Sequence, residues 1–214
     1  MGELLLIGEP GTGKTLLILN LLNFFKRVVW ITTIRSAKVI RNFLGSKYNG
    51  ELWIIDLYTR AGQKKLDSRD FTVGNPLNLN ELSLTIGKVL DNIQNNYLFV
   101  LDSISGLLLY HSTQKIAHIL RNILSRIEDE NAAIISTLVK NAHDYHTEVA
   151  ISMMFLNVIE LDREFCDKHK VKRYIKIIKA SKYVSPELAE FTIDKDKVNL
   201  PKPIEEFIIS TLYH

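Results

Sequence analysis

The sequence has few of the features that mark secreted, membrane-spanning or disulfide-stabilised proteins. Its 214 residues include a single cysteine, Cys166, so no disulfide can form within the chain and a reducing, cytoplasmic compartment is expected. The apolar stretch at residues 4–7 is interrupted at residues 8–14, much too early for a signal peptide or a membrane span. These absences predict a cytoplasmic protein that has no membrane partner.

An excess of charge of one sign is also lacking. Lys and Arg number 27 and Asp and Glu 24, and the net charge of +3 is too small to indicate nucleic-acid binding by itself. The sequence contains no Ser–His–Asp arrangement, no paired-carboxylate site and no guanine-reading N-K-x-D motif, so ATP is the expected nucleotide if one binds. Internal repeats and linkers are absent, and the length suits one domain, so residues 1–214 are expected to form a single unit.

Apolar runs of strand length alternate with helical patterns up to about residue 155. Strands are predicted over residues 3–7, 28–32, 52–57, 97–101 and 132–138. Helices are predicted over residues 14–25, 36–44, 80–95, 113–128 and 149–155. The polar segment between residues 58 and 80 is interpreted as a surface excursion. This alternation is typical of a parallel sheet that is covered by helices.

The last part of the chain has a different pattern. Residues 157–162, 171–180 and 190–193 predict shorter strands and tight turns, which favour an antiparallel edge. The tail, residues 203–214, predicts a helix with an apolar face that docks on its own domain; a partner-binding arm is the alternative. The expected fold class is therefore three-layer α/β, with a mostly parallel central sheet and a C-terminal antiparallel hairpin.

One motif carries chemistry. Residues 8–15 fit the pattern G-x-x-x-x-G-K-[ST] in full, between a predicted strand and a predicted helix. The backbone N–H groups of such a loop converge on phosphates at a helix N-terminus. Lys14 is expected to contact the β- and γ-phosphates, and the Thr15 hydroxyl to bind Mg²⁺. The expected nucleotide-binding residues are Gly8, Glu9, Pro10, Gly11, Thr12, Gly13, Lys14 and Thr15.

A second segment supports this interpretation. Residues 97–102 form an apolar strand that ends in Asp102, which is the form of a Walker B segment. An apolar strand ending in Asp is common, but with the P-loop upstream Asp102 becomes the natural partner of Thr15 in holding magnesium. ATP and Mg²⁺ are therefore the expected cofactors.

Hydrolysis also needs a group that orients or deprotonates the attacking water. The second predicted strand runs into Thr33, Ile34 and Arg35 and offers no carboxylate. The remaining candidates are Asp56, at the end of the third strand, and the hydroxyls at positions 136 and 137 as sensors of the γ-phosphate. Asp56 is interpreted more readily as a capping or turn residue, so the sequence supports nucleotide binding better than turnover.

Together these segments resemble the RecA superfamily, and within it the KaiC-like proteins and the archaeal RadA paralogues. Residues 98–105 are similar to the family's VIDSLS segment, and residues 157–161 to its DGVIxL strand. Residues 174–181 and 191–193 are similar to its KMRGS…FEI hairpin. The resemblance implies a RecA-like P-loop NTPase core, oligomers with ATP between subunits, and a role in DNA recombination or repair or in ATP-dependent regulation.

Two departures from the family pattern affect the chemistry. The paired glutamates that follow the second strand in the family align with Ile34 and Arg35, so the usual catalytic base is missing. The hairpin lysine, which reaches a neighbour's γ-phosphate in the family, matches Lys179, whereas the hairpin arginine aligns with Ser181. The resemblance thus implies that Lys179 contacts nucleotide in trans, within a homo- or hetero-oligomer of RecA-like subunits.

Basic and aromatic residues near position 143 leave a nucleic-acid partner open. Lys140, His143, Tyr145 and His146 fall where RecA relatives place DNA-facing loops, and this mixture suits single-stranded DNA. A solvated loop is an equally good interpretation. Residues 168–176 are a second lysine-rich segment, and exposed hairpins commonly have such a composition.

Two functions are consistent with these observations. The first is a KaiC-like or RadA-paralogue-like ATPase, slow or conditional, whose candidate catalytic residues are Lys14, Asp102 and Asp56. The second is a non-hydrolysing module whose nucleotide state controls partner association. A small-molecule kinase also shares the P-loop, but no arginine-rich lid segment is present.

Overall fold

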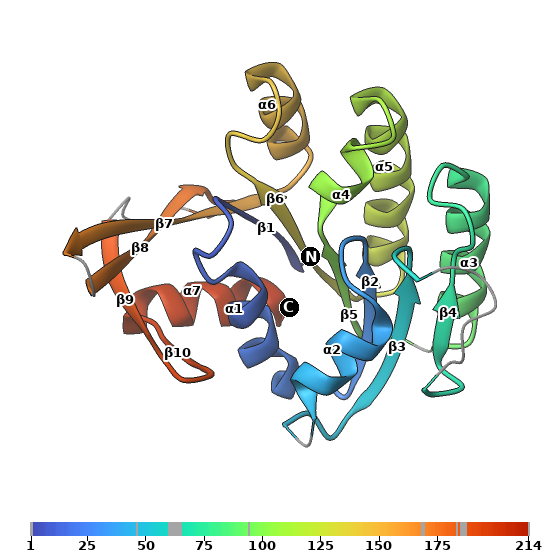
Figure 1. Cartoon of the computed structure of the whole chain (residues 1–214), viewed down its shortest axis with the longest axis horizontal. Coiled ribbons are helices and arrows are strands. Elements are labelled where there is room, and N and C mark those ends of the chain that lie inside the picture. Colours follow the sequence, from blue (N-terminus) through green and yellow to red (C-terminus); the bar gives the residue numbers. More distant parts are fainter. Residues whose placement is uncertain are drawn as a thin grey trace.

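The structure is a computed structural model that describes residues 2–45, 47–59, 66–93, 95–167, 170–182, 184 and 188–213. Its strands form a ten-stranded sheet with the order β10-β9-β8-β7-β1-β6-β5-β2-β3-β4 (Figure 1). The strands from β7 to β4 pair in parallel, whereas β8, β9 and β10 pair antiparallel. The expected α/β fold class, with a mostly parallel sheet and an antiparallel C-terminal part, is confirmed.

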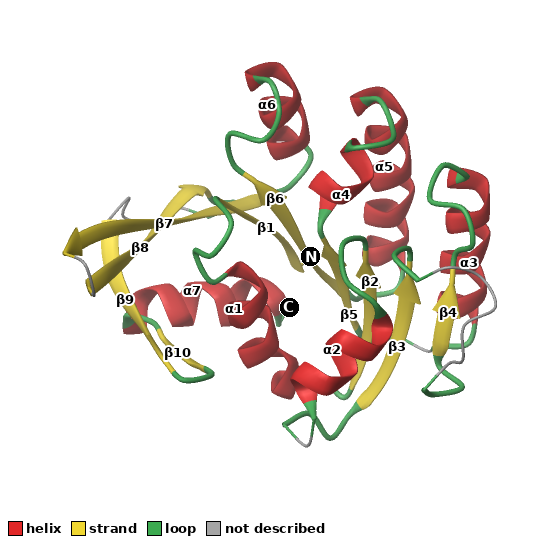
Figure 2. Ribbon diagram, viewed as in Figure 1, coloured by secondary structure: helices red, strands yellow, loops and turns green. Residues whose placement is uncertain are grey.

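The elements follow one another as Figure 2 shows. The strands are β1 (Gly2–Gly8), β2 (Arg27–Thr32), β3 (Glu51–Asp56), β4 (Asp70–Thr72), β5 (Leu98–Asp102), β6 (Ala133–Val139), β7 (Asn157–Asp167), β8 (Lys170–Lys179), β9 (Leu188–Asp194) and β10 (Lys197–Asn199). The helices are α1 (Lys14–Leu21), the 3₁₀ turn η1 (Leu22–Phe24), α2 (Ala37–Leu44), α3 (Leu79–Asp91), α4 (Ile104–Leu108), α5 (Thr113–Asp129), α6 (Tyr145–Met153) and α7 (Lys202–Leu212).

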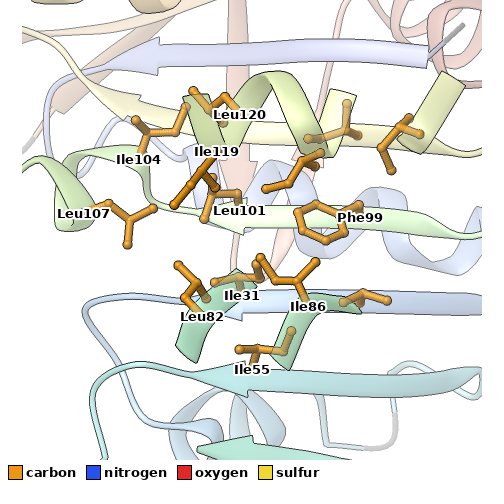
Figure 3. Close-up of a cluster of buried hydrophobic side chains, with 14 of the residues drawn as sticks. Ile31, Ile55, Leu82, Ile86, Phe99, Leu101, Ile104, Leu107, Ile119 and Leu120 are labelled. Atoms are coloured by element: carbon orange, nitrogen blue, oxygen red, sulfur yellow. The ribbon is translucent and has the colours of Figure 1, made fainter. Parts of the chain in front are cut away.

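The sheet separates two hydrophobic cores. Alternate residues of a strand point to opposite faces, so Leu4 and Leu6 enter the core under α1, α2 and α7, while Leu5 and Ile7 enter the core under α3, α5 and α6. In the second core, Phe99 and Leu101 of β5 lie between residues of neighbouring strands and helices (Figure 3). This three-layer arrangement holds the carboxyl ends of the parallel strands along one edge.

The structure corrects the sequence interpretation at two places. The segment between residues 58 and 80 contains β4, a short strand that extends the parallel sheet beyond β3, and residues 60–65 lie outside the described part. Residues 157–162 were predicted to belong to an antiparallel edge, but β7 follows the crossover helix α6 and pairs in parallel with β1. The antiparallel part therefore begins one strand later, at β8.

The tail helix docks on its own domain, as expected. Ile204, Ile208 and Leu212 of α7 are buried in the core that contains Leu4 and Leu6. None of the helices in the described ranges has the length and apolar character needed to cross a bilayer.

Candidate nucleotide-binding site

The predicted site residues gather at the carboxyl ends of the parallel strands, where open α/β sheets bind ligands. The P-loop, residues 8–15, joins β1 to α1. Asp102 ends β5, which is separated from β1 by β6 alone. Thr32 is in register with Asp102 on one side and with Asp56 on the other. The fold thus brings the P-loop and the Walker B carboxylate to one place, as the sequence predicts.

The backbone of the P-loop has conformations that only glycine adopts easily. Gly11 and Gly13 have φ values of 82° and 109°, in the left-handed region. Gly13 is the N-cap of α1, whose N-terminus has no side-chain cap and no acidic residue in its first turn. A helix that begins in this way presents uncompensated N–H groups and a positive dipole to an anion.

Lys14 is folded into the loop that precedes it. Its Nζ donates hydrogen bonds to the carbonyl oxygens of Gly8 and Glu9, the latter at 2.9 Å, and its side chain is largely buried. Burial lowers the pKa of Lys14 to about 8; Asp102 and Glu9 act against this shift, and Arg163 adds to it. A cation that has lost solvation in this way gains strongly from an anionic ligand.

Asp102 is held between the P-loop helix and β6. Its Oδ2 accepts a hydrogen bond from Thr15 Oγ1 at 3.0 Å, and its Oδ1 accepts one from Thr137 Oγ1 at 2.7 Å. Burial raises the pKa of this carboxyl group, against the opposing effect of the two hydroxyl groups. A hydroxyl and a carboxylate oxygen side by side are the hard ligands that Mg²⁺ takes from proteins, with water and phosphate completing its shell, so these residues fit the ion.

The hydroxyl groups at positions 136 and 137 of β6, which the sequence suggested as sensors of the γ-phosphate, are both buried. Thr137 is fully buried and supports Asp102, and Ser136 is fully buried with no hydrogen-bond partner for its Oγ among the described residues. Both are enclosed by the sheet, so the structure favours a supporting role for Thr137 and gives Ser136 no contact with the site.

Asp56 has its carboxylate fully engaged. One oxygen accepts from Ala37 N at 2.7 Å and from Thr59 Oγ1 at 2.6 Å, and the other from the N–H groups of Tyr58 and Thr59, both at 2.8 Å. The residue is 2% exposed and joins the start of α2 to the loop after β3. This arrangement supports the interpretation of Asp56 as a capping residue. Because both oxygens already accept hydrogen bonds, the carboxylate is poorly placed to accept a proton from an attacking water.

The end of β2 carries no acidic side chain near Asp102. Ile34 is 49% exposed, and the carbonyl of Arg35 accepts a hydrogen bond from Thr32 Oγ1 at 2.7 Å. Thr33 Oγ1 exchanges hydrogen bonds with the backbone of Ser103, which fixes this loop against the end of β5. The loop instead places a positive charge near Asp102, since the Arg35 guanidinium acts to lower the pKa of that carboxyl group.

Lys179 lies away from the P-loop of its own subunit. It pairs with Val158, which is in register with Leu5 in the middle of β1, three residues before Gly8. Its Nζ donates to the carbonyl oxygens of Met153 at 3.2 Å and Phe155 at 2.6 Å, beyond the end of α6. A contact between Lys179 and nucleotide therefore requires a second subunit.

Two of the four residues that suggested a DNA-facing segment after β6 contact the rest of the protein. Lys140 forms an ion pair with Glu160 at 2.7 Å, and His143 Nε2 is 2.9 Å from Ser105 Oγ. Tyr145, the first residue of α6, is 78% exposed. In the second lysine-rich segment, residues 168 and 169 lie outside the described part. Single-stranded DNA thus remains a prediction without a defined surface.

Arg163 is the site residue that the sequence reasoning missed. A Cβ on Gly11 would collide with Nη1 of Arg163 and lie 3.1 Å from its Cζ, so this guanidinium rests on the P-loop. A Cβ on Gly13 would lie 2.9 Å from Ile193 Cδ1, which brings β9 against the same loop. The strand pattern of residues 157–162 was visible in the sequence, but the pairing of β7 with β1 was not.

A P-loop after the first strand, a Walker B aspartate two strands away and an antiparallel extension beside β7 define a P-loop NTPase of the RecA type. The family model "ATPase: KaiC" matches residues 2–204, and the chain belongs to this family. The fold is similar to that of a KaiC-like protein from the hyperthermophilic archaeon Pyrococcus horikoshii, with a TM-score of 0.69 and 21% identity over 94% of this chain and 90% of that one. No curated protein gives a significant match.

Proposed function

We propose that the chain is an ATP–Mg²⁺-binding switch whose nucleotide state controls association with other subunits or partners, and whose hydrolysis is slow. The observation that carries this proposal is the contrast within the site. Lys14, Thr15 and Asp102 are assembled for binding, whereas the carboxylates that would activate water are absent or engaged. Membership of an ATPase family supports the nucleotide, and the hydroxyl–carboxylate pair supports the metal ion.

The proposal assigns each binding residue a role. Backbone N–H groups of residues 11–13 and the Lys14 ammonium bind the phosphates, and Thr15 with Asp102 holds the Mg²⁺ that neutralises them. Asp56 has its hydrogen-bonding capacity used by residues 37, 58 and 59, which supports slow rather than efficient turnover. Magnesium supplies charge neutralisation on the β- and γ-phosphates when bound.

Assembly into an oligomer completes the proposal. Lys179 is exposed and lies too far along β8 to serve its own P-loop, which supports a contact with nucleotide on an adjacent subunit. The nucleotide then lies between two subunits and its presence links them. A role in DNA recombination or repair is the second candidate for what such an assembly does; the exposed Tyr145 at the start of α6 is the observation in its favour.

The test is equilibrium binding and turnover of ATP at physiological magnesium, with and without single-stranded DNA. Lys14→Ala should abolish measurable ATP binding, while the wild-type protein should bind ATP and release phosphate far more slowly than the family's paired-glutamate enzymes. Phosphate release that is rapid and lost in Lys14→Ala would overturn the switch and establish an ATPase with another base. Stimulation by DNA would favour the recombination candidate.

A further inference from the structure

We propose that Arg163, together with its cross-strand neighbour Arg173, binds the phosphates of the nucleotide held by the P-loop of the same subunit. The two arginines then contact the terminal phosphates of ATP from the hairpin of β7 and β8. This inference rests on the proposed binding of ATP and adds two phosphate-binding residues to it.

The strand register places both arginines on the side of the hairpin that faces the P-loop. Arg163 and Arg173 are direct partners in the antiparallel pairing, and they lie on the same face as the neighbouring pair, Leu161 and Ile175. Leu161 and Ile175 are buried in the core beneath α1. The two arginines therefore continue this face beyond the core, at the level where β1 ends in the P-loop.

Contacts with the P-loop confirm the direction of this face. The guanidinium of Arg163 rests on Gly11, close enough that a Cβ there could not be accommodated. Phe191, the partner of Arg173 on β9, lies 3.8 Å from the Cβ that Gly13 lacks. Both strands thus approach the loop that would hold the phosphates.

The two arginines of this cluster have no ion-pair partner among the described side chains. Arg173 Nε is also buried without a hydrogen-bond partner in the described part of the chain. Like charges directly opposite each other on paired strands are destabilising, and Lys14 adds a third positive charge nearby. A polyphosphate is the ligand whose charge and size match such a cluster beside a P-loop.

The chemistry of the side chain favours phosphate oxygens in particular. A guanidinium presents a planar fork of N–H donors that matches two phosphate oxygens at once, and an ammonium does not. Arg163 also lies over the Phe165 ring, with its Cζ 5.0 Å from the ring centroid, which holds the plane of the fork.

The experiment is isothermal titration of the full chain with ATP, ADP and AMP in magnesium buffer. Arg163→Ala should weaken ATP binding about ten- to hundredfold, the usual effect of losing a charge-assisted hydrogen-bonding pair, and should leave AMP binding unchanged. Arg163→Lys should restore only part of the loss, since it returns charge but not the fork. Arg121→Ala, an exposed arginine on α5, is the matched control and should bind ATP like the wild type.

The outcomes separate this inference from the function on which it rests. Absence of ATP binding by the wild-type protein would overturn both. ATP binding that is abolished by Lys14→Ala but untouched by Arg163→Ala would overturn the arginine contact alone. An equal loss of ATP and AMP affinity in Arg163→Ala would also contradict it, because a general distortion of the loop does not distinguish the terminal phosphates. Circular dichroism and thermal unfolding of each variant establish that it is folded.

Discussion

The carboxylate of Asp102 uses both of its oxygens within the protein. Thr15 donates to one from the start of α1, and Thr137 donates to the other from β6. The carboxylate is 7% exposed, so these two hydroxyl groups replace most of its contact with water. At the scale of single residues, the carboxylate that we propose to bind Mg²⁺ is therefore positioned by hydrogen bonds within the protein.

Replacement of Thr137 by valine tests this positioning. Thr137→Val keeps the shape of the side chain but leaves one oxygen of a buried carboxylate without its donor, which should lower the free energy of unfolding by about 1–3 kcal/mol. ATP binding should weaken more in magnesium buffer than in EDTA, because the carboxylate that faces the metal ion loses its support. Urea unfolding and calorimetric titration measure the two effects.

The adjacent serine provides the control for this prediction. Ser136 is buried on the same strand with an unpaired hydroxyl, so Ser136→Ala removes a polar atom that has no partner among the described residues. Its unfolding free energy should stay within about 0.5 kcal/mol of the wild type or rise. Equal stability of Thr137→Val and Ser136→Ala would show that the hydrogen bond to Asp102 contributes nothing.

The junction of β1 with β7 depends on polar groups as well as on strand pairing. Asn157 Nδ2 donates to the carbonyl of Glu3 at 3.0 Å, and Asn157 Oδ1 accepts from the backbone of Ser181 at the same distance. Glu3 Oε2 accepts from Leu156 N at 3.2 Å. At the scale of elements, these contacts fix where β7 begins, and so which of its residues reaches the P-loop.

Glu3 makes the stability of this junction dependent on pH. Burial raises the pKa of Glu3, so the folded state binds the proton more tightly than the unfolded state does. Stability is therefore lost as the pH rises from about 4.3, the ordinary value, through the raised folded pKa. Glu3→Gln removes this effect, and its stability relative to the wild type should be higher at pH 7 than at pH 4.

Chemical unfolding at both pH values measures this difference. Glu206→Gln on α7, with its side chain 68% exposed, is the control and should show no comparable change. A Glu3→Gln difference that is the same at pH 4 and pH 7 would mean that the Glu3 carboxyl titrates alike in the folded and unfolded states.

The sequence predicted the elements better than the contacts between them. The spacing of apolar residues indicated β1, β5 and α5, and the helix predicted over residues 36–44 is α2 with its N-cap Ser36, because these signals are local. The short strand β4 was missed, since three residues on a sheet edge leave little pattern. The contact of Arg163 with Gly11 was also missed, because it depends on strand pairing between residues about 150 positions apart in the chain.

The whole molecule is proposed to act with neighbouring copies. Lys179→Ala should reduce the share of larger assemblies that form with ATP and magnesium, because the contact with the adjacent nucleotide is lost. Light scattering coupled to size-exclusion chromatography, with and without ATP, measures this change. Lys202→Ala, whose side chain is 87% exposed on α7, is the control.

A purely internal role for Lys179 would give a different result. Its hydrogen bonds to Met153 and Phe155 are within one subunit, so their loss lowers stability without regard to nucleotide. A Lys179→Ala variant that unfolds more easily but still assembles with ATP like the wild type would contradict the contact in trans.

The central place of β1 sets an order of events during synthesis. β1 is made before the other strands of the sheet, yet its two neighbours are β6 and β7, which are made more than 120 residues later. The loop that follows β1 is also contacted by Arg163 and Ile193, which are made about 150 residues or more after that loop. A growing chain therefore carries the P-loop motif long before the strands around it are made, and the nucleotide that we propose can find its complete site only after β7 and β9 have been added.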